Sequence, residues 1–137
     1  MNLDPSAFIA DKELLDALER RSESVVCEND RILFRQGDEP KGLYVLRSGS
    51  VTLTMTSLTG QVILHTAVSA GALLGLPGFI GGQPYSLTGQ AAKGSVLGFV
   101  TRDDFSDLMS HNPTLSIKVL SVLAAEVRGA RAAISHM

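Results

Sequence analysis

Hydrophobic positions follow a helical spacing at both ends of the chain and a spacing of two in between. Near the N-terminus, apolar residues recur every three to four positions from Phe8 to Leu18, which predicts a helix that opens at Asp4-Pro5 and ends near Arg21. A second helical region begins at Thr101 and continues toward the C-terminus. The pattern predicts a β-rich middle with helices on both sides.

The middle of the chain contains short runs of alternating, β-branched residues. Glycine turns such as Ser48-Gly49 and Thr59-Gly60 separate some of them. The predicted strands are 24–27, 31–35, 42–47, 50–56, 61–68, 85–92 and 96–100. About eight short strands with glycine turns are typical of a small double-sheet barrel or jelly roll. We therefore predict a mainly β fold, a double-stranded β-helix (jelly roll) with N-terminal helices and a long C-terminal helix.

Two helices are predicted after the strands. Thr101 and Asp104 form a capping box for the first, and Asn112 is placed to cap the second, which has Pro113 at its first position. The second helix has an apolar seam at alternating spacings of three and four: Leu120, Leu123, Val127, Ala130 and Ile134. This seam either packs on its own barrel or forms a parallel dimer, and we favour the dimer.

The stretch from Gly71 to Ala91 is rich in glycine and contains no charged residue. A short apolar run, 76–80, lies in its middle. Such a segment suits a backbone cradle for a small anionic ligand, because free amides at a helix start attract anions. The alternative is that the glycines only turn the chain at a barrel corner.

Composition narrows the possible functions. The chain has 137 residues, a formal net charge of −2 and a single cysteine, Cys27. One domain, 1–137, fits this length, and the charge gives no basic surface for nucleic acid. The sequence has neither a membrane-length apolar run nor a basic leader, so we predict a cytoplasmic protein with no membrane contact. The three histidines form no metal-ligand motif and no nucleophile elbow is present, so we predict no enzyme activity.

Two segments resemble the cyclic nucleotide-binding domain of the CRP/FNR superfamily of bacterial regulators. They are Leu33 to Pro40 (LFRQGDEP) and Leu43 to Val51 (LYVLRSGSV), and the likeness continues through Gly71 to Gly75 and Asp104-Phe105. The resemblance covers nearly the whole chain. It implies an eight-stranded jelly roll over 22–100, with a ligand cassette at 71–91, between an N-terminal helical segment at 1–21 and C-terminal helices at 101–137. It also implies that the last helix dimerises and that the ligand pocket closes against it.

In this family the ligand lies in a cassette made of a short helix and the strand after it. A glutamate accepts the ribose hydroxyl and an arginine pairs with the cyclic phosphate. Gly75 matches the cassette glycine, whereas Leu76 falls at the glutamate position and Tyr85 at the arginine position. Loss of the arginine alone weakens such a ligand by roughly 10- to 100-fold. The expected ligand contacts are Leu74, Gly75, Leu76, Gly78, Phe79, Tyr85 and Ser86.

We therefore expect a non-catalytic ligand-sensing domain of CRP/FNR-type signalling or transcription regulation, with altered cyclic AMP recognition. No resident cofactor is expected, and a small anionic effector is a candidate ligand. The alternatives are a degenerate scaffold for dimerisation or protein interaction and, as a poorer fit, a cupin-like metalloenzyme. The family's helix-turn-helix does not follow the last helix within the 137 residues, so we expect no direct nucleic acid binding by this chain. Both a stand-alone sensor domain and a truncated regulator fit a chain in which no helix-turn-helix follows the last helix.

Overall fold

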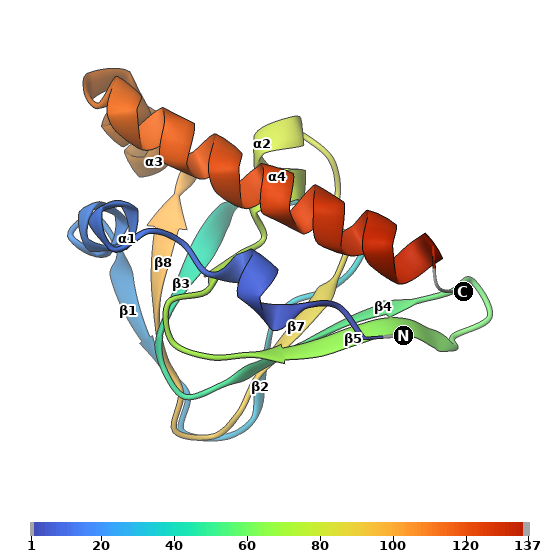
Figure 1. The fold of residues 1–137 in the computed structure, drawn as a ribbon. Helices are drawn as coiled ribbons and strands as arrows, with labels where there is room; N and C mark the ends of the chain where they lie inside the picture. The colour runs from blue at the N-terminus through green and yellow to red at the C-terminus, as the bar shows by residue number, and fades with distance from the viewer. Residues whose placement is uncertain (1, 136–137) are drawn as a thin grey trace.

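The computed structural model describes residues 2–135 and places two antiparallel sheets beside a group of helices (Figure 1). The strands are β1 (Glu23–Val26), β2 (Arg31–Phe34), β3 (Gly42–Ser48), β4 (Val51–Thr56), β5 (Val62–Val68), β6 (Leu73–Leu74), β7 (Thr88–Ala91) and β8 (Val96–Thr101). The helices are the 3-10 helix η1 (Pro5–Phe8), α1 (Lys12–Glu19), α2 (Leu76–Gly81), α3 (Arg102–His111) and α4 (Pro113–Ser135). The predicted mainly β fold with flanking helices and a long C-terminal helix is confirmed.

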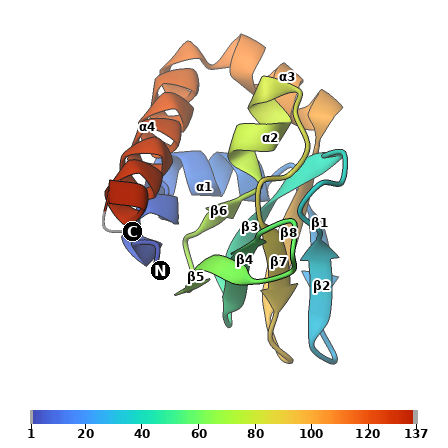
Figure 2. The same ribbon diagram turned by 90° about the vertical axis from the view of Figure 1, so that its right-hand side faces the viewer.

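Each sheet has four strands, in the orders β1-β8-β3-β6 and β2-β7-β4-β5. The pairs along each sheet are antiparallel. Strands that follow one another in the sequence often lie in different sheets, so the chain winds back and forth as in a jelly roll. The α4 helix runs along one side of this β-roll, with η1 beside its C-terminal half (Figure 2).

Strand β3 contributes side chains to two hydrophobic clusters, one on each of its faces. Leu43 and Val45 point into a cluster shared with the helices, whereas Tyr44 and Leu46 point into the cluster between the sheets. A strand covered on both faces reads as a continuous apolar run, because alternate side chains enter different cores. The run LYVL in the sequence is therefore the signature of a central strand.

The single N-terminal helix predicted from Asp4 to Arg21 is wrong. Asp4 caps η1 through the Ser6 amide (3.0 Å), and Asp11 separately caps α1 through the Glu13 amide (3.0 Å). Between the two helices the chain is extended, because the Ala10 amide donates to the Gly71 carbonyl (3.0 Å). The Leu3 amide donates to His65 of β5 (2.9 Å), so this segment joins the edges of both sheets.

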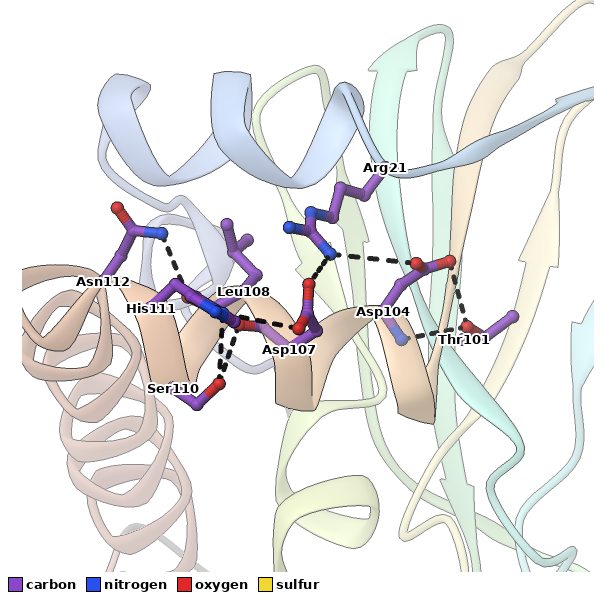
Figure 3. A network of polar contacts seen from close by, with 8 residues as sticks. All are labelled: Arg21, Thr101, Asp104, Asp107, Leu108, Ser110, His111 and Asn112. Carbon is purple, nitrogen blue, oxygen red and sulfur yellow. Dashed lines mark hydrogen bonds and ion pairs between the residues drawn. The ribbon is translucent and has the colours of Figure 1, made fainter.

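Helix α3 begins where the capping box predicted, with the Asp104 amide donating to the Thr101 hydroxyl (3.2 Å). Figure 3 shows Arg21, just after α1, paired with Asp107 and Asp104, which fixes α3 against α1. Helix α4 begins at Pro113, directly after Asn112, as predicted. The Asn112 side-chain amide donates backwards to the Leu108 carbonyl (3.2 Å), so this side chain closes the end of α3.

None of the helices within residues 2–135 has the length and apolar character that a membrane crossing needs.

Candidate ligand site between the β-roll and the last helix

The predicted cassette begins with a tight turn at Gly75. This residue caps α2 with a φ of +87°, in the left-handed region that favours glycine. A Cβ at this position would lie 2.8 Å from Cε1 of Tyr85. Gly78 is equally confined, since a Cβ there would approach the carbonyl oxygens of Gln83 and Pro84 at 2.9 Å. Both glycines allow the loop after α2 to fold closely over the helix.

The structure separates the predicted site residues into two groups. Leu74, Leu76 and Phe79 are buried in the hydrophobic clusters and line neither of the cavities described below. The others, Gly75, Gly78, Tyr85 and Ser86, line a small cavity of about 20 Å³. The role of all seven in binding a ligand stays a prediction.

A strand was predicted over 85–92, but the observed strand β7 begins only at Thr88, and Tyr85 lies in the loop before it. The Tyr85 amide donates to the Asp38 carbonyl (2.9 Å) and its carbonyl accepts from the Gly37 amide (2.9 Å). These two bonds tie the loop to the turn after β2. The alternation of residues in this region suggested a strand, but the long-range bonds decide the conformation.

The Tyr85 side chain fills the end of the cassette. Its ring stacks on Phe34 with centroids 4.5 Å apart, and its hydroxyl donates to the Gly42 carbonyl (2.9 Å). Burial raises the pKa of the Tyr85 hydroxyl to about 12, so the group is neutral at ordinary pH. The residue at the predicted phosphate-binding position is thus a neutral side chain whose hydroxyl already has a hydrogen-bond partner.

A larger cavity of about 240 Å³ lies next to the small one, between α4, η1 and the β4–β5 pair. The two cavities share Phe8, Pro77, Ser86, Leu87 and Glu126. The remaining residues of the larger cavity are Leu3, Asp4, Ala7, Met55, Leu64, Val127, Gly129 and Ala130. The lining is mostly apolar, and its two ionisable residues are both acids.

Glu126 is the residue that sequence reasoning missed. Its Oε2 atom is buried and has no hydrogen-bond partner among the described residues. Burial raises the pKa of the Glu126 carboxyl from 4.5 to about 8. The signal was present in the sequence, because Glu126 continues at helical spacing the inward row formed by Leu115, Val119 and Val122.

Comparison with known proteins places this geometry in a family. Residues 24–112 match the family model of the cyclic nucleotide-binding domain. The chain belongs to the cyclic nucleotide-binding domain family. The match runs from the second residue of β1 through α3 and includes the whole cassette, and α4 follows it.

Among the curated relatives of this cyclic nucleotide-binding domain is the fumarate and nitrate reduction regulatory protein of Vibrio cholerae. It is 28% identical over 97 residues, covering 71% of this chain and 38% of the relative. The corresponding protein of Yersinia pestis is 28% identical over 102 residues, covering 74% of this chain and 40% of the relative. The chain thus spans about two fifths of the length of the curated relatives it matches. These matches support a domain of the CRP/FNR type.

Solved structures share the fold. The catabolite activator protein of Thermus thermophilus superimposes with a TM-score of 0.80 at 24% identity, covering 91% of this chain and 59% of that one. The sensor domain of the transcriptional regulator DNR from Pseudomonas aeruginosa gives a TM-score of 0.66 at 23% identity, covering 83% and 77%. At these identities the likeness shows the jelly-roll fold alone.

Within this cyclic nucleotide-binding domain, the electrostatics of the cavities differ from what a phosphate requires. No Lys or Arg is among the residues that line either cavity, whereas Asp4 and Glu126 carry carboxyl groups. An anion entering the site would lose its hydration without gaining a charged partner. The apolar lining instead suits the body of an uncharged or cationic molecule.

Arg102 positions the cassette from outside the cavities. Its guanidinium donates to the carbonyls of Phe79 (3.1 Å) and Pro40 (3.4 Å), and it lies 4.3 Å above the Phe79 ring. We expect Arg102→Ala to lower the free energy of unfolding by about 1–2 kcal/mol. Arg102→Lys should recover less than half of this loss, because an ammonium cannot reach both carbonyls while covering the ring.

Urea denaturation followed by circular dichroism measures both Arg102 variants. Arg35→Ala, which removes an arginine from an exposed position of the turn after β2, is the matched control and should change little. Equal stability of the Arg102→Ala and Arg35→Ala proteins would show that the Arg102 contacts contribute nothing.

Within the part of the chain that the structure describes, no group of three or more His, Cys, Asp or Glu side chains lies together as a metal site would require.

Proposed function

We propose that this chain is the effector-sensing, non-catalytic part of a CRP/FNR-type regulator, and that it acts as a homodimer through α4. The observation that carries the proposal is the position of α4. One side of the helix contributes Glu126 and Ala130 to the larger cavity, and another side presents apolar residues to solvent. A ligand on one side therefore bears on the same helix that would hold the partner copy.

The solvent-facing side of α4 has the spacing of a helix pair. Leu120 is 60% exposed and Ile134 59%, and Ile117 is also exposed. Val127, 47% exposed, belongs to this side and also lines the larger cavity. The predicted seam is shifted in part, because Leu123 is half-buried against the core of its own domain. Exposed apolar residues three and four positions apart, with the small Ala124 between them, fit a second copy of α4.

A single charge on this side tests the dimer. We expect Leu120→Glu to weaken self-association by a factor of about 30 or more, because it places a carboxylate in the centre of an apolar interface. Sedimentation equilibrium of both proteins measures the effect. The control is Leu58→Glu, in the β4–β5 turn, where the side chain is fully exposed (109%) and the same charge should change nothing.

Two results would contradict the dimer. One is a wild-type protein that stays monomeric at high concentration, and the other is a Leu120→Glu variant that associates as strongly as Leu58→Glu. Either would remove α4 as the link between ligand and partner.

A second function, a dimerisation scaffold that binds no ligand, is favoured by one observation. Tyr85 and Phe34 fill the cassette so closely that only about 20 Å³ remains beside Gly75 and Gly78. The scaffold predicts a dimer whose stability no small molecule alters. The sensor predicts that a ligand of the larger cavity shifts the dimerisation constant, and sedimentation with and without ligand separates the two.

The relatives' wider roles reach this chain only as proposals. We propose a place in transcription regulation, as for the regulatory proteins it matches, without direct contact between residues 2–135 and nucleic acid. The net charge of −2 supports this, because non-specific binding to DNA requires a basic surface.

A further inference from the structure

Glu126 is an exception to the rule that buried polar atoms have hydrogen-bond partners. Its Oε2 atom is inaccessible to solvent and unpartnered among the described residues, at the place where the two cavities meet. A carboxyl group in such a site lowers the stability of the folded protein unless something bonds to it.

The chain's own donors do not supply such a partner. The other acid of the larger cavity, Asp4, accepts from the amide (3.0 Å) and the hydroxyl (2.7 Å) of Ser6. The Glu126 carboxyl has no comparable neighbour, and no Lys or Arg is among the residues that line either cavity. The nearest arginine along the helix, Arg128, lines a different cavity with Asn2 and Ser6. One cavity thus combines apolar walls, two acids and an unused acceptor.

We propose that the larger cavity binds a small apolar molecule that carries one protonated amine, which donates to the Glu126 carboxyl. This inference rests on the proposed sensor function and names the chemical class of its ligand. The cavity volume of about 240 Å³ lies below the roughly 300–1,000 Å³ of sites for drug-sized ligands, so the molecule is small. Its apolar body packs against residues such as Phe8, Met55 and Leu64.

The charge of the site selects an amine over other head groups. A phosphate or carboxylate would meet the negative charge of Asp4, with no Lys or Arg in the lining to balance it. A hydroxyl would bond to the Glu126 carboxyl but would gain no charge attraction. An ammonium gains both once the carboxyl gives up its proton, and because that carboxyl is already buried in the free protein, the ligand bears most of the loss of hydration.

Proton balance gives the binding reaction a signature. Burial raises the pKa of the Glu126 carboxyl to about 8, so near neutral pH the free protein holds a proton there. When the ammonium binds, that proton leaves to solvent and the carboxylate accepts the N–H bond. The other ionisable groups of the cavities keep their charge: hydrogen bonds from Ser6 lower the pKa of Asp4, and burial raises the pKa of Tyr85 to about 12.

The experiment compares three probes that share one aromatic body: phenethylamine, phenethyl alcohol and hydrocinnamate. Each is titrated into the 137-residue chain by calorimetry near neutral pH, in buffers of different ionisation enthalpy. We expect the amine to bind at least tenfold more tightly than the alcohol, and hydrocinnamate to bind more weakly than either. The heat of amine binding should vary with the buffer, because a proton is released.

Two variants locate the interaction. Glu126→Gln should weaken phenethylamine binding about tenfold or more and leave the alcohol nearly unchanged, while Glu39→Gln, at an exposed position that lines neither cavity, should change neither. Ala130→Leu, which narrows the larger cavity, should weaken both probes. Circular dichroism confirms that each variant is folded.

Several results would overturn the amine class. They are absence of binding by all three probes, tighter binding of hydrocinnamate or cyclic AMP than of phenethylamine, and an amine affinity that Glu126→Gln does not change. Tight cyclic AMP binding with an intact α4 dimer would keep the sensor function and reject only the amine. A wild-type protein that stays monomeric in the sedimentation test would reject the sensor function while the probe affinities remain readable.

Discussion

At about pH 8, Glu126→Gln is expected to raise the free energy of unfolding by about 4 kcal/mol, whereas at pH 4.5 the variant and the wild type should be equally stable. The folded protein holds a proton on Glu126 that the unfolded chain releases near pH 4.5. The free energy of unfolding of the wild type therefore has its full value below pH 4.5 and falls as the pH rises toward 8. Glutamine stays neutral throughout and removes that slope.

Urea denaturation at a series of pH values between 4.5 and 8 measures the effect. Glu39→Gln is the control, since its curve should run parallel to that of the wild type. Glu126→Met, which also removes the polar atoms, should be at least as stable as Glu126→Gln because no unpartnered amide remains. If the wild-type and Glu126→Gln curves run parallel, Glu126 is solvated or paired in solution.

The second large effect is expected at Leu76. Leu76→Glu should lower the free energy of unfolding by about 4 kcal/mol or more, because the side chain is fully buried among Leu43, Phe79 and other apolar residues. A domain of this size has a total stability of about 5–15 kcal/mol, so the variant will be close to unfolding. Part of the stability should return in acid, where the introduced carboxyl is protonated.

Leu76→Met is the matched control, with an expected cost below about 1.5 kcal/mol for an apolar residue of similar volume. Circular dichroism and urea denaturation compare the two variants. The result bears on function, since the family resemblance predicts that Leu76 stands where a ribose-binding glutamate is expected. Wild-type stability of Leu76→Glu would mean that this position opens toward the cavities and that a glutamate there reaches a ligand.

The sequence predicted the parts of the fold that depend on local pattern. The strands β3 and β4 follow from runs of β-branched and apolar residues, and the start of α3 follows from the capping box at Thr101. The helical break at Ile9 and Ala10 does not, because it depends on a hydrogen bond to Gly71, far along the chain. Periodicity describes which face is apolar, and it carries no information about such a bond.

Of the predicted ligand contacts, Gly75, Gly78, Tyr85 and Ser86 line one small cavity, whereas Leu74, Leu76 and Phe79 do not. Glu126 was not among the predicted residues. Which side chains turn inward depends on how the last helix is rotated against the roll. That rotation brings Glu126 to the cavity and turns Leu120 to solvent. A rotation of the helix by only part of a turn would change which of these side chains faces the roll.

The N-terminal segment that joins the two sheet edges has a consequence for how the protein is made. Residues 2–10 leave the ribosome long before their hydrogen-bond partners, His65 and Gly71, have been synthesised. Contacts between positions so distant in the sequence form late in folding, because closing a long loop costs conformational entropy before the contact can stabilise it. During this interval the apolar residues of the segment that line the larger cavity, such as Leu3 and Phe8, have no partner to pack on and stay exposed on the growing chain.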